Sequence, residues 1–505
     1  MELALDKLFS DNMVLPSGRT FRVSGRGVPG RMIRVRVASQ VVTTSVTASG
    51  TWSVEVDPGG DAHPKEGSLV VDDKQSGAKV VVEHVRFGHV YLLGGQSNIE
   101  FRMREDEGYV QALDAMPQPW AYVYTVPQVE YLADDGSVMP EGLDGGAWLP
   151  LGSASLGNVS AVGYYALQAI HREHPDEVVG LVDCFKGGTS ASCWVPPEVL
   201  VDPSLHEAYV EPFEAAIADK DEADFDREQE TYESLVERHN DDLARYRAAH
   251  PDRTLSEAKN VVGHTPWPPP ARPTSPYRPS GLYGTMFVPA SSYSYSAIVW
   301  YQGEDDSKHA KLYHQLLTGL IGAWRHALHD AEVPIYVMQL PGYADDLPDS
   351  WALVRQAQLR VSYEMPGVHL VSIADTGDEH NIHPASKRVA GERLGRVLSS
   401  HSCDGTPVPG KVHLRDDALT VEVDDAESIA SDGDAVAEVR EDTGWNRVCM
   451  TVQNDPPRVL IPVGANTTRV RYGYENYPHL VIRDDFGQPL APFELALKEG
   501  EWSLA

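Results

Sequence analysis

Four short stretches carry residues that could do chemistry, and each follows a segment with the pattern of a strand. The first is Gly94-Gly95-Gln96-Ser97-Asn98, directly after the apolar run 90–93, and the second is Lys186-Gly187-Gly188-Thr189. The third is WYQGEDD at 300–306, and the fourth is His380-Asn381-Ile382-His383-Pro384. Because functional groups of open α/β sheets gather at the carboxyl ends of strands, we expect these stretches to meet there.

The serine of the first stretch has two interpretations. Glycines before Ser97 allow a sharp turn that exposes a hydroxyl, but a polar serine in a glycine turn is also an ordinary structural feature. His383 stands before a proline at an expected helix start, which suits a general base. A backbone N–H at Gly188 and the side-chain amide of Gln302 could stabilise an oxyanion. Taken together, these groups predict acyl transfer by an activated serine.

Other side chains near these stretches are candidates for binding a substrate. Trp300 could form a pocket wall against a sugar face, and Glu304 could orient a ligand or act as a structural acceptor. Arg102 and Arg355 could pair with a substrate carboxylate, although arginines also form structural ion pairs. Acidic residues precede the second histidine of the fourth stretch, but no His-x-x-x-His helix pair accompanies them. We therefore expect neither a metal nor another cofactor.

Alternating strand and helix patterns must position these stretches. The expected strands are 90–93, 178–183, 297–301, 334–339 and 369–373, and the expected helices are 161–174, 311–329 and 385–399. This alternation predicts an α/β fold with a mostly parallel, doubly wound sheet over residues 87–402. Short alternating runs with turn residues between them predict β-sandwich-like regions at 1–86 and 403–505.

A charged, helix-favouring segment and a proline-rich run interrupt the expected core between 200 and 282. The run WPPPARP at 267–273 indicates an extended conformation. It could lie near the mouth of the site or serve as a simple tether, and the sequence does not decide between these roles.

Composition excludes several classes of protein. The 505 residues carry a net charge of −32, which repels phosphate backbones and anionic lipids, so we expect no nucleic-acid partner. No apolar run approaches the ~20 residues of a membrane span. The opening MELALDKLFSDNMVL lacks a basic region followed by an apolar one, so we expect a cytoplasmic location, although a chain trimmed of a leader would look the same.

The four cysteines, Cys184, Cys193, Cys403 and Cys449, are interpreted as thiols rather than a disulfide framework. The oligomeric state is not predicted.

In order along the chain, the motifs resemble the sialate O-acetylesterase family of carbohydrate esterases, within the SGNH hydrolase superfamily. The resemblance spans most of the chain, through LFSDNMVL (8–15), GGQSNIE (94–100), GGTSASCW (187–194), WYQGEDD (300–306), RQAQ (355–358), residues 375–384 and GERL (391–394). It implies a three-layer α/β/α core flanked by β domains. It also implies a serine esterase that removes O-acetyl groups from sugars, above all from O-acetylated sialic acid. The alternatives are an acetylxylan or oligosaccharide acetylesterase and, in another class, a non-catalytic carbohydrate-binding protein.

The resemblance also implies roles for individual residues. Ser97 would be the nucleophile and His383 the general base. The backbone N–H groups of Ser97 and Gly188, with the side chain of Gln302, would form the oxyanion hole. Many relatives have asparagine where this chain has Asp306, and a carboxylate there occurs in acetylxylan-type relatives.

The third member of the triad departs from the pattern. The superfamily often has an aspartate three residues before the catalytic histidine, where this chain has His380. Asn381 stands where this family often has an aspartate. Asp378 could orient the imidazole as the acid, or a backbone carbonyl, such as that of His380, could do so in a Ser-His dyad.

Overall fold

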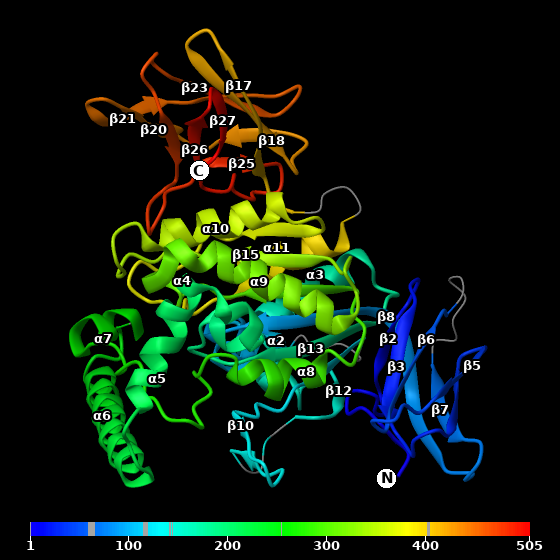
Figure 1. Ribbon diagram of the computed structural model, residues 1–505. Coiled ribbons are helices and arrows are strands. Elements are labelled where there is room, and N and C mark those ends of the chain that lie inside the picture. Colours follow the sequence, from blue (N-terminus) through cyan, green and yellow to red (C-terminus); the bar gives the residue numbers. More distant parts are fainter. Residues whose placement is uncertain are drawn as a thin grey trace.

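The computed structural model describes residues 2–58, 66–114, 120–140, 143, 145–253, 255–400 and 405–505, and it is a mixed α/β protein (Figure 1). Its largest sheet has 11 strands, seven of which lie in the order β12-β9-β13-β8-β14-β15-β16. These strands are β8 (Lys79–Gly95), β9 (Ala121–Thr125), β12 (Trp148–Pro150), β13 (Val179–Phe185), β14 (Ala297–Tyr301), β15 (Ile335–Gln339) and β16 (Val368–Ser372).

The strands from β9 to β16 in this order run parallel to one another, and β12 pairs antiparallel with β9 at the edge. On one side of β8 lie β13 and then β9, although β9 comes first in the chain, and on the other side the later strands β14, β15 and β16 follow in order. Every residue of β13 and β14 is buried, as expected of parallel strands covered on both faces. The direction of winding reverses at β8, and such a switch point opens a crevice at the carboxyl ends of the strands.

Helices accompany this sheet in two packed pairs. The helix α3 packs against α11, and α9 packs against α10. The helices of this region are α1 (Ser97–Glu100), α2 (Tyr109–Asp114), α3 (Ala161–Glu173), α8 (Val288–Ala290), α9 (Ala310–Leu328), α10 (Ser350–Glu364) and α11 (Arg388–Ser399). The expected helices at 161–174, 311–329 and 385–399 correspond to α3, α9 and α11. The helix α10 was not among the expected elements.

The first 73 residues supply short strands at one side of the molecule (Figure 1). They are β1 (Ala4–Leu5), β2 (Val14–Pro16), β3 (Phe21–Arg26), β4 (Met32–Val37), β5 (Gln40–Ser45), β6 (Thr51–Val56) and β7 (Gly67–Asp73). One sheet has the order β1-β3-β6, while β5, β4, β7 and β2 join the large sheet. They join it because the first part of β8 pairs with β7 and β2, and its last part forms the centre of the parallel region. The expected boundary at 86/87 therefore falls inside β8.

The C-terminal residues form further antiparallel sheets at another side of the core (Figure 1). The expected boundary at 402/403, and with it Cys403, lies outside the described residues. The strands are β17 (Val408–Arg415), β18 (Ala418–Asp424), β19 (Ile429–Ser431), β20 (Val436–Glu441), β21 (Gly444–Cys449), β22 (Thr451–Gln453), β23 (Arg458–Pro462), β24 (Arg469–Tyr472), β25 (Ile482–Asp484), β26 (Phe493–Lys498) and β27 (Glu501–Leu504).

The segment between β13 and β14 leaves the sheet and forms helices beside it (Figure 1). Its helices are α4 (Pro203–Leu205), α5 (Glu211–Ile217), α6 (Glu222–Ala249) and α7 (Leu255–Val262), and α8 follows them before β14. Asp221 caps α6 by accepting from the N–H of Asp224, which closes a capping box, and only Phe225 of this helix is buried. A small hairpin of β10 (Tyr131–Leu132) and β11 (Val138–Met139) follows β9. No helix among the described residues combines the length and the apolar character needed to cross a membrane.

Candidate active site

The register of three parallel strands brings three of the four candidate stretches to one edge. Gly95 of β8 stands beside Phe185 of β13 and Tyr301 of β14. The chain continues from these positions to Ser97, to Gly188 and to Gln302. The first three stretches therefore leave the sheet side by side, as the strand pattern predicts.

The turn before the serine requires a glycine. Gly95 has φ of +139°, and a Cβ there would come within 2.0 Å of the carbonyl oxygen of Tyr301. The next N–H, that of Gln96, donates to the same carbonyl at 3.2 Å. Only glycine permits this close approach, and the turn ends at Ser97, which begins α1 and is half-buried.

The fourth stretch reaches the serine through its second histidine. Nε2 of His383 lies 2.7 Å from the hydroxyl oxygen of Ser97. When Nε2 accepts the serine proton, Nδ1 is the ring nitrogen that carries the imidazole N–H. Asn381 holds the backbone of this histidine at both ends, because its amide donates to the carbonyl of His383 at 2.7 Å and accepts from its N–H at 3.2 Å.

Two further side chains, which were not predicted to be functional, donate hydrogen bonds to the backbone around this histidine. The Asn98 amide donates to the carbonyl of Ile382 at 2.9 Å, and the Lys387 ammonium donates to the carbonyl of Pro384 at 2.9 Å. The same ammonium donates to the Asn98 side-chain oxygen at 2.8 Å. The residue after the serine thus fixes the loop that carries His383. Its adjacency to Ser97 in the motif was the only available indication of this role.

The second stretch lies against the serine, since a Cβ at Gly187 would come within 3.5 Å of the Cβ of Ser97. The N–H of Gly187 donates to the carboxylate of Glu100, and Gly188 follows with φ of +72°. The N–H groups of Ser97 and Gly188 make no hydrogen bond to any of the residues that the structure describes. Both N–H groups are therefore free to donate to another group. The positioning role of Glu100 was not expected from the sequence.

Comparison with known proteins agrees with this geometry. Residues 277–401 match the sequence profile of the family described as "Carbohydrate esterase, sialic acid-specific acetylesterase". The sialate O-acetylesterase of Mus musculus is 23% identical over 437 residues, which are 79% of this chain and 74% of the mouse protein. The crystal structure of a carbohydrate acetylesterase from Xanthomonas citri superposes with a TM-score of 0.69 at 22% identity, covering 98% of this chain and 99% of that one, which shows a shared fold.

The chain is similar to carbohydrate esterases of the sialate O-acetylesterase type. It is accordingly a carboxylic ester hydrolase. Among the described residues of this esterase, no group of three or more histidine, cysteine or acidic side chains is placed to hold a metal ion.

The prediction that Gln302 donates to the oxyanion is wrong. Its side chain is fully buried, and Nε2 already faces Asp306 Oδ2 at 2.6 Å, Gln96 Oε1 at 3.1 Å and the carbonyl of Thr189 at 3.2 Å. Two amide hydrogens shared among three protein acceptors leave none for a substrate. Gln302 instead connects the turns that carry Gln96 and Thr189 to Asp306.

Two predicted substrate contacts of the esterase are also wrong, because both side chains lie in the interior. Trp300 is fully buried, and its ring packs edge-on against Trp194 and Trp324. Glu304 is 4% exposed and accepts from the Asn98 amide at 2.7 Å. Glu304 thus belongs to the support of the histidine loop rather than to a sugar-binding surface.

The two predicted arginines have different places. Arg102 lines the same cavity as Ser97 and His383, where a substrate can reach it. Arg355 does not, because it is fully buried in α10 and donates to the backbone carbonyls of Leu340, Pro341, Glu475 and Asn476. Its role is to join the core to the C-terminal region, so its assignment to the substrate is wrong.

The cavity at the serine has a volume of about 780 Å³. Asp378 lies on its wall, and one of its carboxylate oxygens accepts the N–H groups of His380 and Asn381, each at 3.0 Å. These bonds shape the turn that leads to His383. The role of Asp378 as the acid of a triad stays a prediction.

Burial and neighbouring cations determine the electrostatics of the site. Burial, with the charges of Lys387, Lys259 and His264, lowers the pKa of His383 to about 3. Burial also lowers the pKa of Lys387 to about 7, against the attraction of Glu304, whose own pKa burial raises. The imidazole is therefore neutral at physiological pH and able to accept a proton.

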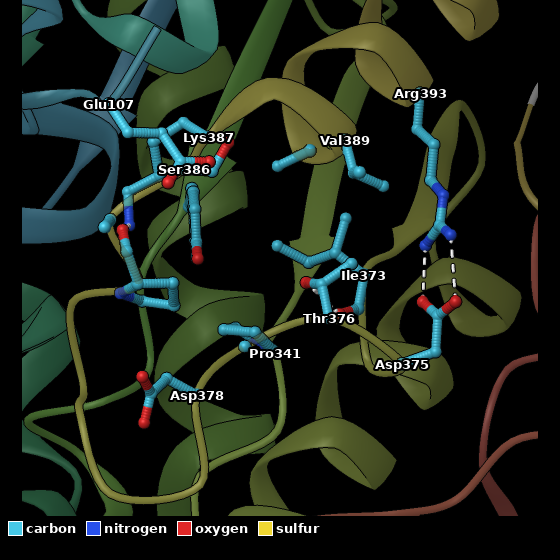
Figure 2. A pocket seen from close by; sticks show the side chains of 15 residues that line it. Glu107, Pro341, Ile373, Asp375, Thr376, Asp378, Ser386, Lys387, Val389 and Arg393 are labelled. Atoms are coloured by element: carbon cyan, nitrogen blue, oxygen red, sulfur yellow. Dashed lines mark hydrogen bonds and ion pairs between the residues drawn. The ribbon is translucent and has the colours of Figure 1, made fainter. Parts of the chain in front are cut away.

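A second cavity, of about 470 Å³, is lined in part by residues 376–378 and 384–387, which precede and follow His383. Figure 2 shows the Asp375–Arg393 ion pair on one side of it, with Glu107 and Lys387 on the opposite side. Asp375 also pairs with Arg483 of the C-terminal region, and these two guanidinium groups lower the pKa of its carboxyl. The acidic residue at the start of the loop thus anchors it structurally.

Proposed function

We propose that this esterase removes O-acetyl groups from sialic acid through an acetyl-Ser97 intermediate. The observation that supports the proposal is the 2.7 Å contact between Ser97 Oγ and His383 Nε2 at the carboxyl edge of the sheet. The shared fold with a carbohydrate acetylesterase and the match to a sialic acid-specific family support the substrate class. We further propose that the core is the three-layer α/β/α arrangement of SGNH hydrolases, with the α3–α11 and α9–α10 pairs as its outer layers.

In the proposed mechanism, His383 Nε2 takes the proton of Ser97 as Oγ attacks the acetyl carbonyl carbon. The negative oxygen of the tetrahedral intermediate accepts hydrogen bonds from the N–H groups of Ser97 and Gly188. The imidazolium then protonates the departing sugar oxygen, which leaves acetyl-Ser97. A water deprotonated by His383 attacks this ester, releasing acetate and restoring the serine.

The substrate is tested by comparing acetate release from O-acetylated sialic acid with release from acetylated xylo-oligosaccharides. We expect the larger kcat/KM for the acetylated sialic acid. A preference for the xylo-oligosaccharide would instead favour the acetylxylan alternative. The sequence pointed to this alternative because acetylxylan-type relatives have a carboxylate at the position of Asp306. If acetate is released from neither of the two substrates, the proposal is contradicted.

The pH dependence of activity follows from the lowered pKa of His383. Activity requires the neutral imidazole, and a pKa of about 3 keeps it neutral well below its ordinary value of 6.5. We therefore expect the acid limb of kcat/KM, measured with 4-nitrophenyl acetate, to lie below pH 6.5. A limb at or above pH 6.5 would contradict this expectation.

The same lowered pKa, which preserves activity at low pH, makes the folded protein less stable there. Between pH 3 and 6.5 an unfolded His383 binds a proton that the folded one does not. The contribution of this group to the free energy of unfolding therefore falls as the pH decreases through this window. Activity at each pH should accordingly be read after confirming, by circular dichroism, that the protein is still folded.

A further inference from the structure

The segment 200–282, whose role the sequence left open, forms part of the wall of the serine cavity. Its helix α7 brings Leu255 and Lys259 into the same cavity that Ser97 and His383 line. The two residues are four positions apart and so share one face of the helix. The segment is thus more than a tether, because it adds an aliphatic side chain and an ammonium group to the cavity that Ser97 and His383 line.

Contacts beyond α7 fix this segment on the oxyanion turn. The indole of Trp267 lies so close to Gly188 that a Cβ there would come within 2.2 Å of the ring. The indole N–H donates to Asp305 at 3.3 Å, and its ring meets Tyr277 edge-on with centroids 5.0 Å apart. Tyr232 of α6 donates to the carbonyl of Pro266 at 3.1 Å. These contacts, with the packing of α7 on α6, define where Lys259 stands relative to Ser97.

Lys259 differs from the other two cations that line the cavity. Arg102 donates to the carbonyl of Asn158 at 2.6 Å and pairs with Glu100 at 3.4 Å. Arg104 donates to the side-chain oxygen of Asn158. The half-buried ammonium of Lys259 has neither an ion pair nor a hydrogen bond to any residue within the described ranges. An anion in the cavity would supply the missing partner.

We infer that Lys259 binds the carboxylate of an acidic sugar while Ser97 attacks an acetyl ester on the same sugar. The inference rests on the proposed function and names the group that selects the substrate. The chain carries a net charge of −32, so an anionic substrate needs a local cation at the site. Lys259 is also within electrostatic reach of the reacting residues, because its charge is one of the causes that lower the pKa of His383.

The test compares one acetylated sugar with and without its negative charge. O-acetylated sialic acid and its carboxyl methyl ester are assayed by acetate release with the wild type and with Lys259→Gln. We expect the substitution to lower the preference for the acid over its methyl ester about 10- to 100-fold, through KM, since a hydrogen bond to a charged group has been lost. Lys259→Arg should keep most of the preference. Lys220→Gln, which removes a lysine of the same segment paired with Glu228 at 2.7 Å, should leave it unchanged.

A second measurement separates binding from a structural effect. Removing the ammonium should raise the pKa of His383 and move the acid limb of kcat/KM for 4-nitrophenyl acetate to higher pH. Free sialic acid should inhibit that neutral reaction, and Lys259→Gln should weaken the inhibition. Equal losses on the acid and its methyl ester, or an unchanged preference, would overturn the inference. Failure of the proposed function would look different, because Ser97→Ala would then still hydrolyse 4-nitrophenyl acetate.

Discussion

Replacing Ser97 by alanine is expected to lower kcat for acetate release by about 10⁴- to 10⁶-fold, with the fold intact. The loss follows from the removal of the hydroxyl oxygen that we propose as the nucleophile, which lies 2.7 Å from His383 Nε2. Replacing His383 by alanine should cost a similar factor, because the serine then has no base. Since the two side chains act as one unit, the double variant should be no slower than the slower single variant.

Steady-state kinetics on an acetyl ester, with circular dichroism of each variant, checks this result. Ser49→Ala, which changes an exposed serine in a turn of the N-terminal strands, is the matched control and should retain full activity. Incubation with a radiolabelled acetyl ester should label the wild-type protein transiently and leave Ser97→Ala unlabelled. Retention of wild-type turnover by Ser97→Ala would refute the nucleophile assignment.

Replacing Asp306 by alanine is expected to lower the free energy of unfolding by about 3–5 kcal/mol, the cost of breaking a buried network around a charge. Its fully buried carboxylate accepts from Ser190 Oγ at 2.7 Å, the N–H of Ala191 at 2.8 Å, Tyr209 OH at 2.8 Å and Gln302 Nε2 at 2.6 Å. Alanine leaves all four donors without this acceptor. Activity should fall as well, because the network connects the turn after β13 with the one after β14.

Urea denaturation of the wild type and the variant measures the change in stability. Asp306→Asn is the matched control, since it keeps the shape and one acceptor oxygen but places an amide against donors. The free energy of unfolding of Asp306→Asn should lie between that of the wild type and that of Asp306→Ala. A loss below about 1 kcal/mol for Asp306→Ala would show that the network is not structurally important.

The sequence predicted the elements near the site well where the patterns were local. Strand β14 was expected at its observed bounds, and β13, β15 and β16 within two residues of theirs. The meeting of Ser97 and His383 followed because parallel strands end at one edge. The helix α10 was missed for a different reason. Its buried residues include Arg355, Gln356 and Gln358, so the sequence lacks the apolar pattern that indicates a buried helix.

The errors at the site share one physical cause. The side on which a polar residue after a strand projects is decided by tertiary partners that are distant in sequence. Gln302 and Glu304 turn inward because Asp306 and Asn98 are there to bond them. Arg355 is buried because carbonyls at 475 and 476 meet it. No local pattern encodes these partners, nor does one place Lys259 in the serine cavity.

The strand β8 limits where recombination can exchange one part of this esterase for another. Its 17 residues run from the N-terminal strands through the centre of the parallel sheet and end two residues before Ser97. No linker separates the N-terminal region from Ser97, so recombination at that junction would cut the strand that leads to this serine. The helices α6 and α7 lie between two strands of the sheet, β13 and β14, and replacing these two helices leaves every strand whole. Evolution can therefore exchange the substrate-selecting part of the enzyme far more freely than its N-terminal sheet.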